Sequence, residues 1–137
     1  MVSISLISQS IKNARIEVNP MPNGEHPIEA PMNYSVNFRN DGKEFRCLFR
    51  QEVRSKDIPG GIEIMIEMVA RFSCMEITTD EERREAHVES YKMLFPYMQS
   101  IVSDFMQKAG LTPINLQPVK MDSARVAGNT KVSNNLN

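Results

Sequence analysis

The sequence predicts an α+β fold in which an antiparallel sheet is followed by a helix. Apolar and polar residues alternate between residues 34 and 77, turn signals divide this region into three runs, and a helix-start signal follows at residue 79. A length of 137 residues suits one domain with a sizeable core. We expect a single domain over residues 1–121 and a loose polar tail over residues 122–137, where apolar residues become sparse and asparagines accumulate.

The amino-terminal region predicts one further strand and a long loop. Its apolar residues fit two periods, strand alternation at Ala14, Ile16 and Val18 and helical spacing at Ile4, Ile7 and Ile11. We interpret residues 7–18 as a strand. Residues 19–31 contain four prolines and a glycine, so we expect a crossover loop without regular structure. Long loops of this kind in a small domain are typically functional.

Three runs between residues 34 and 77 predict an antiparallel meander. The first run ends at Asn40-Asp41-Gly42 and the second at Ile58-Pro59-Gly60-Gly61, which are both turn signals. Apolar residues occupy one face of each run and polar residues the other. The polar face of the middle run carries Arg46, Arg50 and Arg54, which form either a modest anion-binding stripe or an ordinary soluble sheet face.

The region after the meander predicts helical structure. Thr79 and Glu82 have the spacing of a capping box, so a helix opens near residue 79. Pro96 lacks a backbone donor, and we therefore expect two helical segments that divide there. The second segment carries a broad apolar stripe and ends at Gly110. This stripe comprises Tyr97, Met98, Ile101, Val102, Phe105 and Met106. The sheet covers part of the stripe, and we expect a second copy of the chain to cover the rest.

Composition excludes several classes of function. The 16 basic residues nearly balance 17 acidic ones, which argues against a globally basic nucleic-acid binder. No apolar run reaches the length of a membrane span, and the first residues lack a cationic leader, so we expect a cytoplasmic protein without membrane insertion. The ten methionines suit either core filling or a surface that accepts many shapes.

Catalytic and metal-binding motifs are missing from the sequence. Cys47 and Cys74 lie among apolar residues and are expected to be reduced, packed thiols. His26 and His87 are expected at the surface of the loop and the helix, and none of these four residues has the short spacing of zinc ligands. We therefore expect no enzyme activity, no catalytic residues, no metal and no cofactor.

Two motifs resemble the SecB family of export chaperones. They are the helix junction Leu94-Phe95-Pro96-Tyr97 and the later segment Ile114-Asn115-Leu116-Gln117-Pro118-Val119. The order of strand, crossover loop, meander and helix also agrees with the family over residues 7–121. The resemblance implies a four-stranded antiparallel sheet with a long helix packed on one side, assembled as a dimer of dimers. It also implies an ATP-independent chaperone that holds unfolded preproteins or another non-native client in apolar grooves.

The resemblance also assigns residues to surfaces. It places Val36 and Phe38 at groove positions on the second strand, and Met21, Ile28 and Met32 in the crossover that borders the groove. Core packing is an equally supported alternative for these residues. The helix residues Tyr97, Ile101 and Phe105 match the helix that packs between dimers, so we expect a homotetramer.

The sequence departs from the family in one respect that concerns partners. Members that dock on the SecA translocase motor present an acidic sheet face, whereas this sequence places Lys12, Arg15 and the three arginines of the middle run there. SecA as a partner therefore stays open. Two alternatives also stay open: a SecB-like chaperone dedicated to one client such as an antitoxin, and a structural or adaptor oligomer without chaperone activity.

Overall fold

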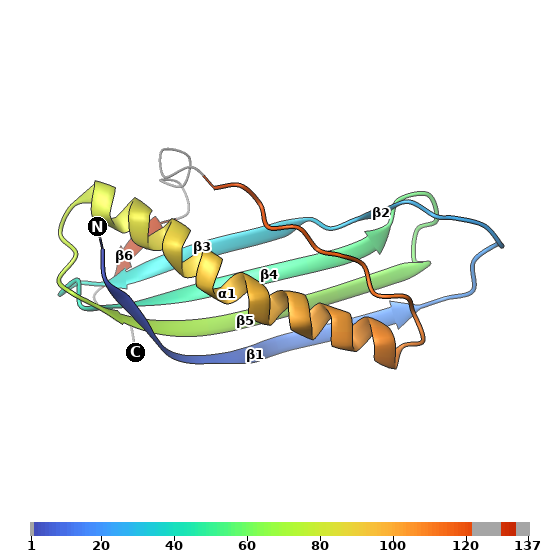
Figure 1. Cartoon of the computed structure of the whole chain (residues 1–137), viewed down its shortest axis with the longest axis horizontal. Helices are drawn as coiled ribbons and strands as arrows, with labels where there is room; N and C mark the ends of the chain where they lie inside the picture. Colours follow the sequence, from blue (N-terminus) through green and yellow to red (C-terminus); the bar gives the residue numbers. More distant parts are fainter. Residues whose placement is uncertain (1, 122–129, 134–137) are drawn as a thin grey trace.

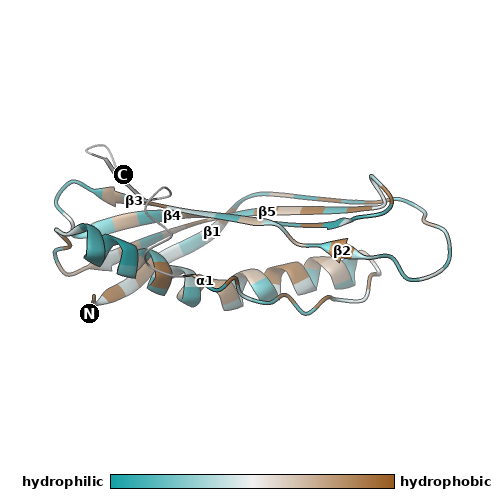
Figure 2. Cartoon of the chain, turned by 90° about the horizontal axis from the view of Figure 1, so that it is seen from above, coloured by the Kyte–Doolittle hydropathy of each residue, from teal (hydrophilic) through white to brown (hydrophobic). Residues whose placement is uncertain are grey.

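The computed structural model describes residues 2–121 and 130–133, in which six strands form one sheet and one helix covers one of its faces (Figure 1; Figure 2). The elements are β1 (Ile4–Val18), β2 (Ile28–Glu29), β3 (Met32–Arg39), β4 (Glu44–Ser55), β5 (Ile62–Cys74), α1 (Asp80–Lys108) and β6 (Thr130–Ser133). The strand order is β1-β5-β4-β3-β6, and β2 pairs with β4. The predicted α+β fold is confirmed, with four long antiparallel strands and two short additions.

The meander forms as predicted from its turn signals. Gly42, at the β3–β4 turn, has a φ of +71°, and its amide donates to the carbonyl of Arg39 at 2.9 Å. A side chain at position 42 would collide with the backbone of Ile77, so the turn requires glycine for space as well as for conformation. The register sets Phe45 opposite both Phe38 and Phe72, which brings three aromatic rings to the helix side of the sheet.

Strand β1 lies at one edge of the sheet. It begins at Ile4 rather than at residue 7, and β-bulges interrupt its pairing with β5 at Ile7 and Lys12. Ile16 and Val18 lie opposite the buried Ile64 and Ile62, yet both are exposed. The second half of β1 therefore leaves part of its apolar surface open to solvent.

The crossover contains one short regular element that the sequence did not predict. Ile28 and Glu29 form β2, opposite Ser55 and Arg54 of β4. The expectation of a wholly irregular loop is wrong here, because these two residues lie between Pro27 and Pro31 and keep their own backbone donors.

Helix α1 begins where the sequence predicts and continues further. Thr79 caps it, and the Thr79 side chain and the Glu82 carboxylate satisfy each other's backbone donors. The helix runs through Pro96 without division, so the prediction of two segments is wrong. Pro96 and Lys92 both lie on the exposed side, so the carbonyl of Lys92, which loses its usual donor, is not trapped in the core. No helix among the described residues combines the length and apolar character needed to cross a membrane.

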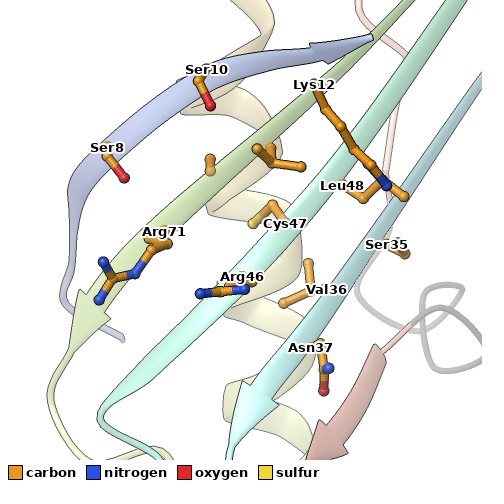
Figure 3. A pocket seen from close by; sticks show the side chains of 12 residues that line it. Ser8, Ser10, Lys12, Ser35, Val36, Asn37, Arg46, Cys47, Leu48 and Arg71 are labelled. Carbon is orange, nitrogen blue, oxygen red and sulfur yellow. The ribbon is translucent and has the colours of Figure 1, made fainter. Parts of the chain in front are cut away.

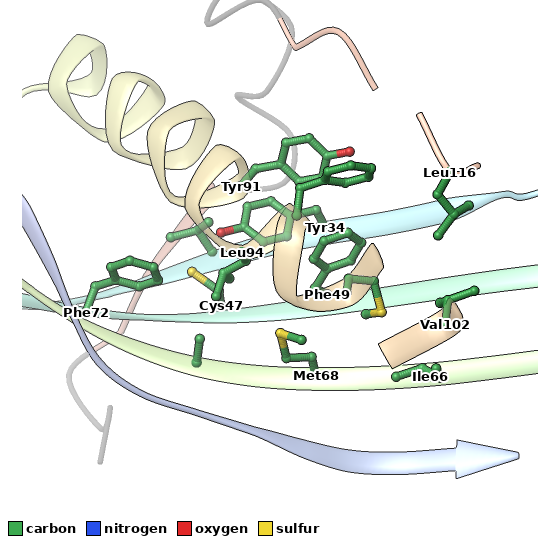
Figure 4. Close-up of a cluster of buried hydrophobic side chains, with 14 of the residues drawn as sticks. Tyr34, Cys47, Phe49, Ile66, Met68, Phe72, Tyr91, Leu94, Val102 and Leu116 are labelled. Carbon is green, nitrogen blue, oxygen red and sulfur yellow. The ribbon is translucent and has the colours of Figure 1, made fainter. Parts of the chain in front are cut away.

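The hydrophobic core lies between α1 and the sheet (Figure 4). Tyr34 of β3 forms edge-on ring contacts with Phe49, His87 and Tyr91. His87 is fully buried, so its predicted place on the helix surface is wrong. It lies one turn before Tyr91, on the side of α1 that faces the sheet, and burial lowers its pKa to about 4. His87 is thus a neutral core residue.

The end of the chain adds a strand. Residues 130–133 form β6, which pairs in parallel with residues 36–39 of β3. The expectation of a loose tail is wrong for these four residues, because the outer edge of β3 offers free backbone donors and acceptors. The rest of the predicted tail, residues 122–129 and 134–137, lies outside the described residues.

Candidate binding groove

A groove of about 320 Å³ lies on the helix side of the sheet, between the crossover and the segment that follows α1. Its lining is largely apolar, and side-chain amides supply the remaining polar groups. It consists of Ile28, Ala30, Met32, Gln51, Ile114, Asn115, Leu116, Gln117 and Val119. None of these residues carries a charge. The groove therefore suits apolar side chains together with the hydrogen-bonding groups of an extended backbone.

The segment after α1 forms one wall of the groove because the helix end turns it back. The amide of Gly110 donates to the carbonyl of Gln107 at 3.0 Å, and the amide of Leu111 donates to the carbonyl of Met106 at 2.8 Å, which is a Schellman motif. Gly110 has the left-handed φ of +77° that this motif requires.

Two further hydrogen bonds hold this wall against the helix. The Gln99 side chain donates to the carbonyl of Leu116 at 3.0 Å, and the amide of Val119 donates to the Tyr91 hydroxyl at 2.8 Å. The Leu116 side chain is buried beneath them. The wall is thus anchored through the carbonyl of Leu116 and the amide of Val119.

The crossover forms the opposite wall, and β4 holds it in place. The Gln51 side chain donates to the carbonyls of Ala30 and Pro31, at 3.1 and 3.2 Å. The Arg54 guanidinium lies 2.7 Å from the Glu29 carboxylate and holds the pKa of that carboxyl below its usual value. Buried amide bonds near the groove and an exposed ion pair outside it together fix this wall.

His26 clamps the outer part of the crossover. Its Nδ1 lies 2.7 Å from the Asp57 carboxylate and its Nε2 lies 2.6 Å from the Pro22 carbonyl. Both partners are acceptors, so only the doubly protonated imidazolium donates to both. The hydrogen bond to Asp57 accordingly raises the pKa of His26. His26 is partly covered, with 15% of its side chain exposed, rather than a free surface residue.

The residues predicted to bind clients divide into two groups. Val36 and Phe38 are each 1% exposed and lie in the core beneath α1, so the structure corrects their assignment to an open groove. Both side chains lie on the face of β3 that packs against the helix. Core packing was the alternative that the sequence left open for them. Ile28 and Met32 do line the groove, whereas the partly buried Met21 packs against Gly61 instead.

Sequence reasoning missed three apolar residues of the groove. Ile114, Leu116 and Val119 line it, although the sequence identified their segment only as an extended crossing element and a family motif. The alternation of Ile114 and Leu116 with Asn115 and Gln117 was the available signal for two of them, and Val119 falls outside this alternation. Two hydrogen bonds bring this segment beside the helix motif Leu94-Phe95-Pro96-Tyr97. They join it to Tyr91 and Gln99, which flank the motif on α1.

The residues predicted at an oligomer interface differ in exposure. Tyr97 is 44% exposed, whereas Ile101 and Phe105 are partly buried against the core of their own subunit. Further exposed apolar side chains lie on β1. They are Ile7, Ile11, Ile16 and Val18. Helix and edge strand together therefore leave more apolar surface open than the predicted stripe alone.

The nucleophilic and metal-ligating side chains of the described residues do not gather into a reactive site. Cys47 and Cys74 are free thiols, and burial raises the pKa of Cys47 to about 12 and that of Cys74 to about 11. Such thiols are protonated and unreactive at neutral pH. In the described ranges, no three His, Cys, Asp or Glu side chains are placed to hold a metal ion.

Residues 43–124, which span β4, β5, α1 and the groove wall after it, match the family described as Preprotein translocase subunit SecB. The chain belongs to the SecB family. Membership supports a chaperone role in protein export, and the sequence-based assignment to this family is confirmed.

Two similar proteins and a solved structure extend this match. An uncharacterized protein of Methanocaldococcus jannaschii is 22% identical over 81% of this chain and 75% of its own length. The protein-export protein SecB of a Ruegeria species is 26% identical over 75% of this chain, which spans 61% of that protein. The fold matches that of a Mycobacterium tuberculosis SecB-like chaperone, solved in complex with a ChAD peptide from the HigA1 antitoxin. That match has a TM-score of 0.69 and 15% identity, over 85% of this chain and 90% of the other.

Proposed function

We propose that this SecB-family protein is an ATP-independent cytoplasmic chaperone that holds non-native polypeptides, with the groove described above as its client site. The observation that carries the proposal is an uncharged apolar groove between two chain segments that lack long regular elements. The Mycobacterium tuberculosis relative was solved with a peptide from another protein, which supports a peptide as the class of ligand. The protein acts by binding, and no chemical step is part of this proposal.

The composition of the groove suits clients of many sequences. Met32 and the aliphatic side chains across from it offer dispersion and hydrophobic contacts without demanding one shape, because methionine side chains are flexible. The amides of Asn115 and Gln117 offer donors and acceptors to any extended backbone. Binding should therefore depend on apolar burial and respond little to salt.

The test measures light scattering while guanidinium-unfolded citrate synthase aggregates, with no ATP present. We expect the parent protein to suppress scattering, and the double variant Met32→Ser/Ile114→Ser to lose most of this suppression. Both residues pack partly against the core, so the variant removes apolar surface without adding a charge, and its circular dichroism and melting temperature are compared with those of the parent. Met75→Ser is the matched control, because Met75 is highly exposed and lies outside the groove. If both variants suppress scattering as the parent does, the groove assignment is wrong. If the parent itself suppresses nothing, the chaperone proposal fails and the adaptor alternative takes its place.

We further propose that the subunits assemble into a homotetramer through the exposed apolar residues of α1 and β1. The outer edge of β1 has no strand beside it among the described residues, and four exposed aliphatic side chains accompany that open edge. Tyr97 adds an exposed aromatic ring on the helix. Exposed apolar side chains beside an open strand edge favour association with another copy.

A further inference from the structure

The sheet face opposite the helix carries a hollow of about 700 Å³ that the proposed function does not use (Figure 3). We call it the cationic hollow. It is lined by Ser8, Ser10, Lys12, Ser35, Val36, Asn37, Arg46, Cys47, Leu48, Val69, Ala70 and Arg71. Of these, Val36, Cys47 and Ala70 belong to the buried core on the other side of the sheet and contribute little exposed surface. Its lining holds three cationic side chains and no carboxylate.

The strand register explains the shape and charge of the cationic hollow. Two neighbouring rows cross the four long strands, one of Asn37, Arg46, Arg71 and Ser8 and the next of Ser35, Leu48, Val69 and Ser10. The short side chains of Ser8 and Ser10 on β1 and of Ser35 on β3 leave the surface recessed, and the half-buried Leu48 and Val69 form an apolar floor. Like charges directly opposite each other, as Arg46 and Arg71 are, do not help a sheet to fold.

Two of the three cations have no carboxylate partner among the described residues. Arg71 pairs with Glu44 at 2.7 Å, whereas no described acidic side chain lies within ion-pair distance of Arg46 or Lys12. Figure 3 shows Lys12 reaching from β1 toward Leu48, which its position in the β-bulge allows. In addition, Asn37 Oδ1 and Arg71 Nε are buried without a hydrogen-bond partner in the described part of the chain.

The stripe of Arg46, Arg50 and Arg54 that the sequence offered as a possible anion-binding site is not such a site as a whole. Arg50 lies 3.3 Å from Glu52, and Arg54 lies 2.7 Å from Glu29, so acidic neighbours neutralise both. Arg46 alone of the three keeps its charge available, and it is joined by Lys12 and Arg71 from the neighbouring strands. The other end of the same face, around Arg15, is lined by arginines and glutamates together.

We propose that the cationic hollow binds an acidic segment of a partner protein, an extended peptide in which carboxylates alternate with small apolar side chains. The guanidinium of Arg46 suits a carboxylate, and Lys12 offers a second charge across the apolar floor. Nucleic acid fits less well, because three cations neutralise few phosphates and none of the described residues that line the hollow is aromatic and able to stack on a base. A second copy of the chain would bring cations against cations. The site lies on the opposite side of the sheet from the groove, so it is independent of the proposed function.

The experiment measures fluorescence anisotropy of a labelled ten-residue peptide in which aspartate alternates with valine. The same peptide with lysine in place of aspartate, a ten-nucleotide oligothymidylate and inorganic phosphate are the other probes. Arg46→Glu is the test variant, and Arg15→Glu is its matched control, with the same change of charge on the same face at the mixed end. Lys12→Glu, at an exposed position of the edge strand, tests the site again in case Arg46→Glu lowers the melting temperature.

We expect the aspartate peptide to bind more tightly than the lysine peptide and more weakly as salt rises. Arg46→Glu and Lys12→Glu should each weaken it about tenfold, and Arg15→Glu less than about twofold. Equal binding of both peptides, or equal losses in Arg46→Glu and Arg15→Glu, would overturn the proposal. So would tighter binding of the oligothymidylate, or displacement of the peptide by millimolar phosphate, which would indicate a nucleic-acid or a small-anion site instead.

Discussion

At the scale of single residues, a small polar cluster lies inside the apolar core. The Ser90 hydroxyl donates to the carbonyl of His87 at 3.0 Å, so the Tyr34 hydroxyl, 2.6 Å away, donates to Ser90. Both residues are buried. The cluster therefore links β3 to α1 through a bond that neither partner can replace with water.

This bond predicts unequal costs for its two partners. Ser90→Ala leaves the Tyr34 hydroxyl buried without an acceptor, which should lower the free energy of unfolding by about 1–3 kcal/mol. Adding Tyr34→Phe to Ser90→Ala removes the unpaired hydroxyl and should regain part of this loss. Urea unfolding of the two single variants and the double variant measures the coupling. Strictly additive losses would contradict the proposed bond.

The pKa values of the two histidines should be shifted in opposite directions. Asp57 raises the pKa of His26 above 6.5, so its stabilising effect is complete below pH 6.5 and disappears as pH rises through the raised value. Burial lowers the pKa of His87 to about 4, so its contribution is lost as pH falls from 6.5 toward 4. Imidazole resonances followed by NMR, assigned with a His26→Gln variant, measure both midpoints. A His26 midpoint at or below 6.5 would show that the clamp does not form in solution.

At the scale of elements, the β3–β4 turn tolerates substitution of its glycine less well than its sequence suggests. Gly42 and Gly110 have nearly the same left-handed φ, +71° and +77°, but only at Gly42 would a side chain meet backbone, that of Ile77. Gly110→Ala should cost about 1 kcal/mol for the conformation alone. Gly42→Ala should cost more than about 2 kcal/mol, because the connection to α1 must also move. Thermal or urea unfolding compares the two; equal losses would mean that the connection yields freely.

The elements also show which signals in the sequence were sufficient. Alternation and turn residues predicted β3, β4 and β5, and the Thr79–Glu82 spacing predicted the start of α1, because these signals are local. Pro96 misled because its cost depends on whether Lys92 faces solvent, and exposure is a property of the packed structure. The prediction for His87 was wrong because the first half of α1 is rich in charged residues and gives no clear apolar stripe. The burial of His87 becomes evident only when the packed structure places the Tyr34 ring against it.

The groove was predictable only in part for the same reason. Ile28 and Met32 were identified because they occur in a long proline-rich loop. Ile114, Leu116 and Val119 join them through the Schellman turn at Gly110 and the side chains of Gln99 and Tyr91. No local sequence pattern reveals that the segment after Gly110 lies opposite the crossover. The cationic hollow likewise depends on the register of four strands.

At the scale of the whole molecule, assembly should depend on exposed rather than half-buried residues of the predicted stripe. Tyr97→Asp should shift the protein to smaller species in sedimentation velocity while its circular dichroism stays unchanged. Ile101 and Phe105 are poorer choices, because a charge there would also disturb the subunit core. Met75→Asp is the control. A parent protein that sediments as a monomer at micromolar concentration would rule out the proposed tetramer.

The pairing of β1 with β5 has a consequence for how the chain is made. Ile4 pairs with Cys74 and Val18 with Ile62, so β1 is synthesised before its partner and stays unpaired until β5 has left the ribosome. The meander closes by local turns, whereas docking β1 requires a long loop to close first. We expect β1 to join after the barrier to folding has been crossed. Substitutions in it should then speed unfolding and leave the folding rate nearly unchanged. Until β1 joins, the nascent chain carries an unpaired apolar strand and itself resembles a chaperone's client.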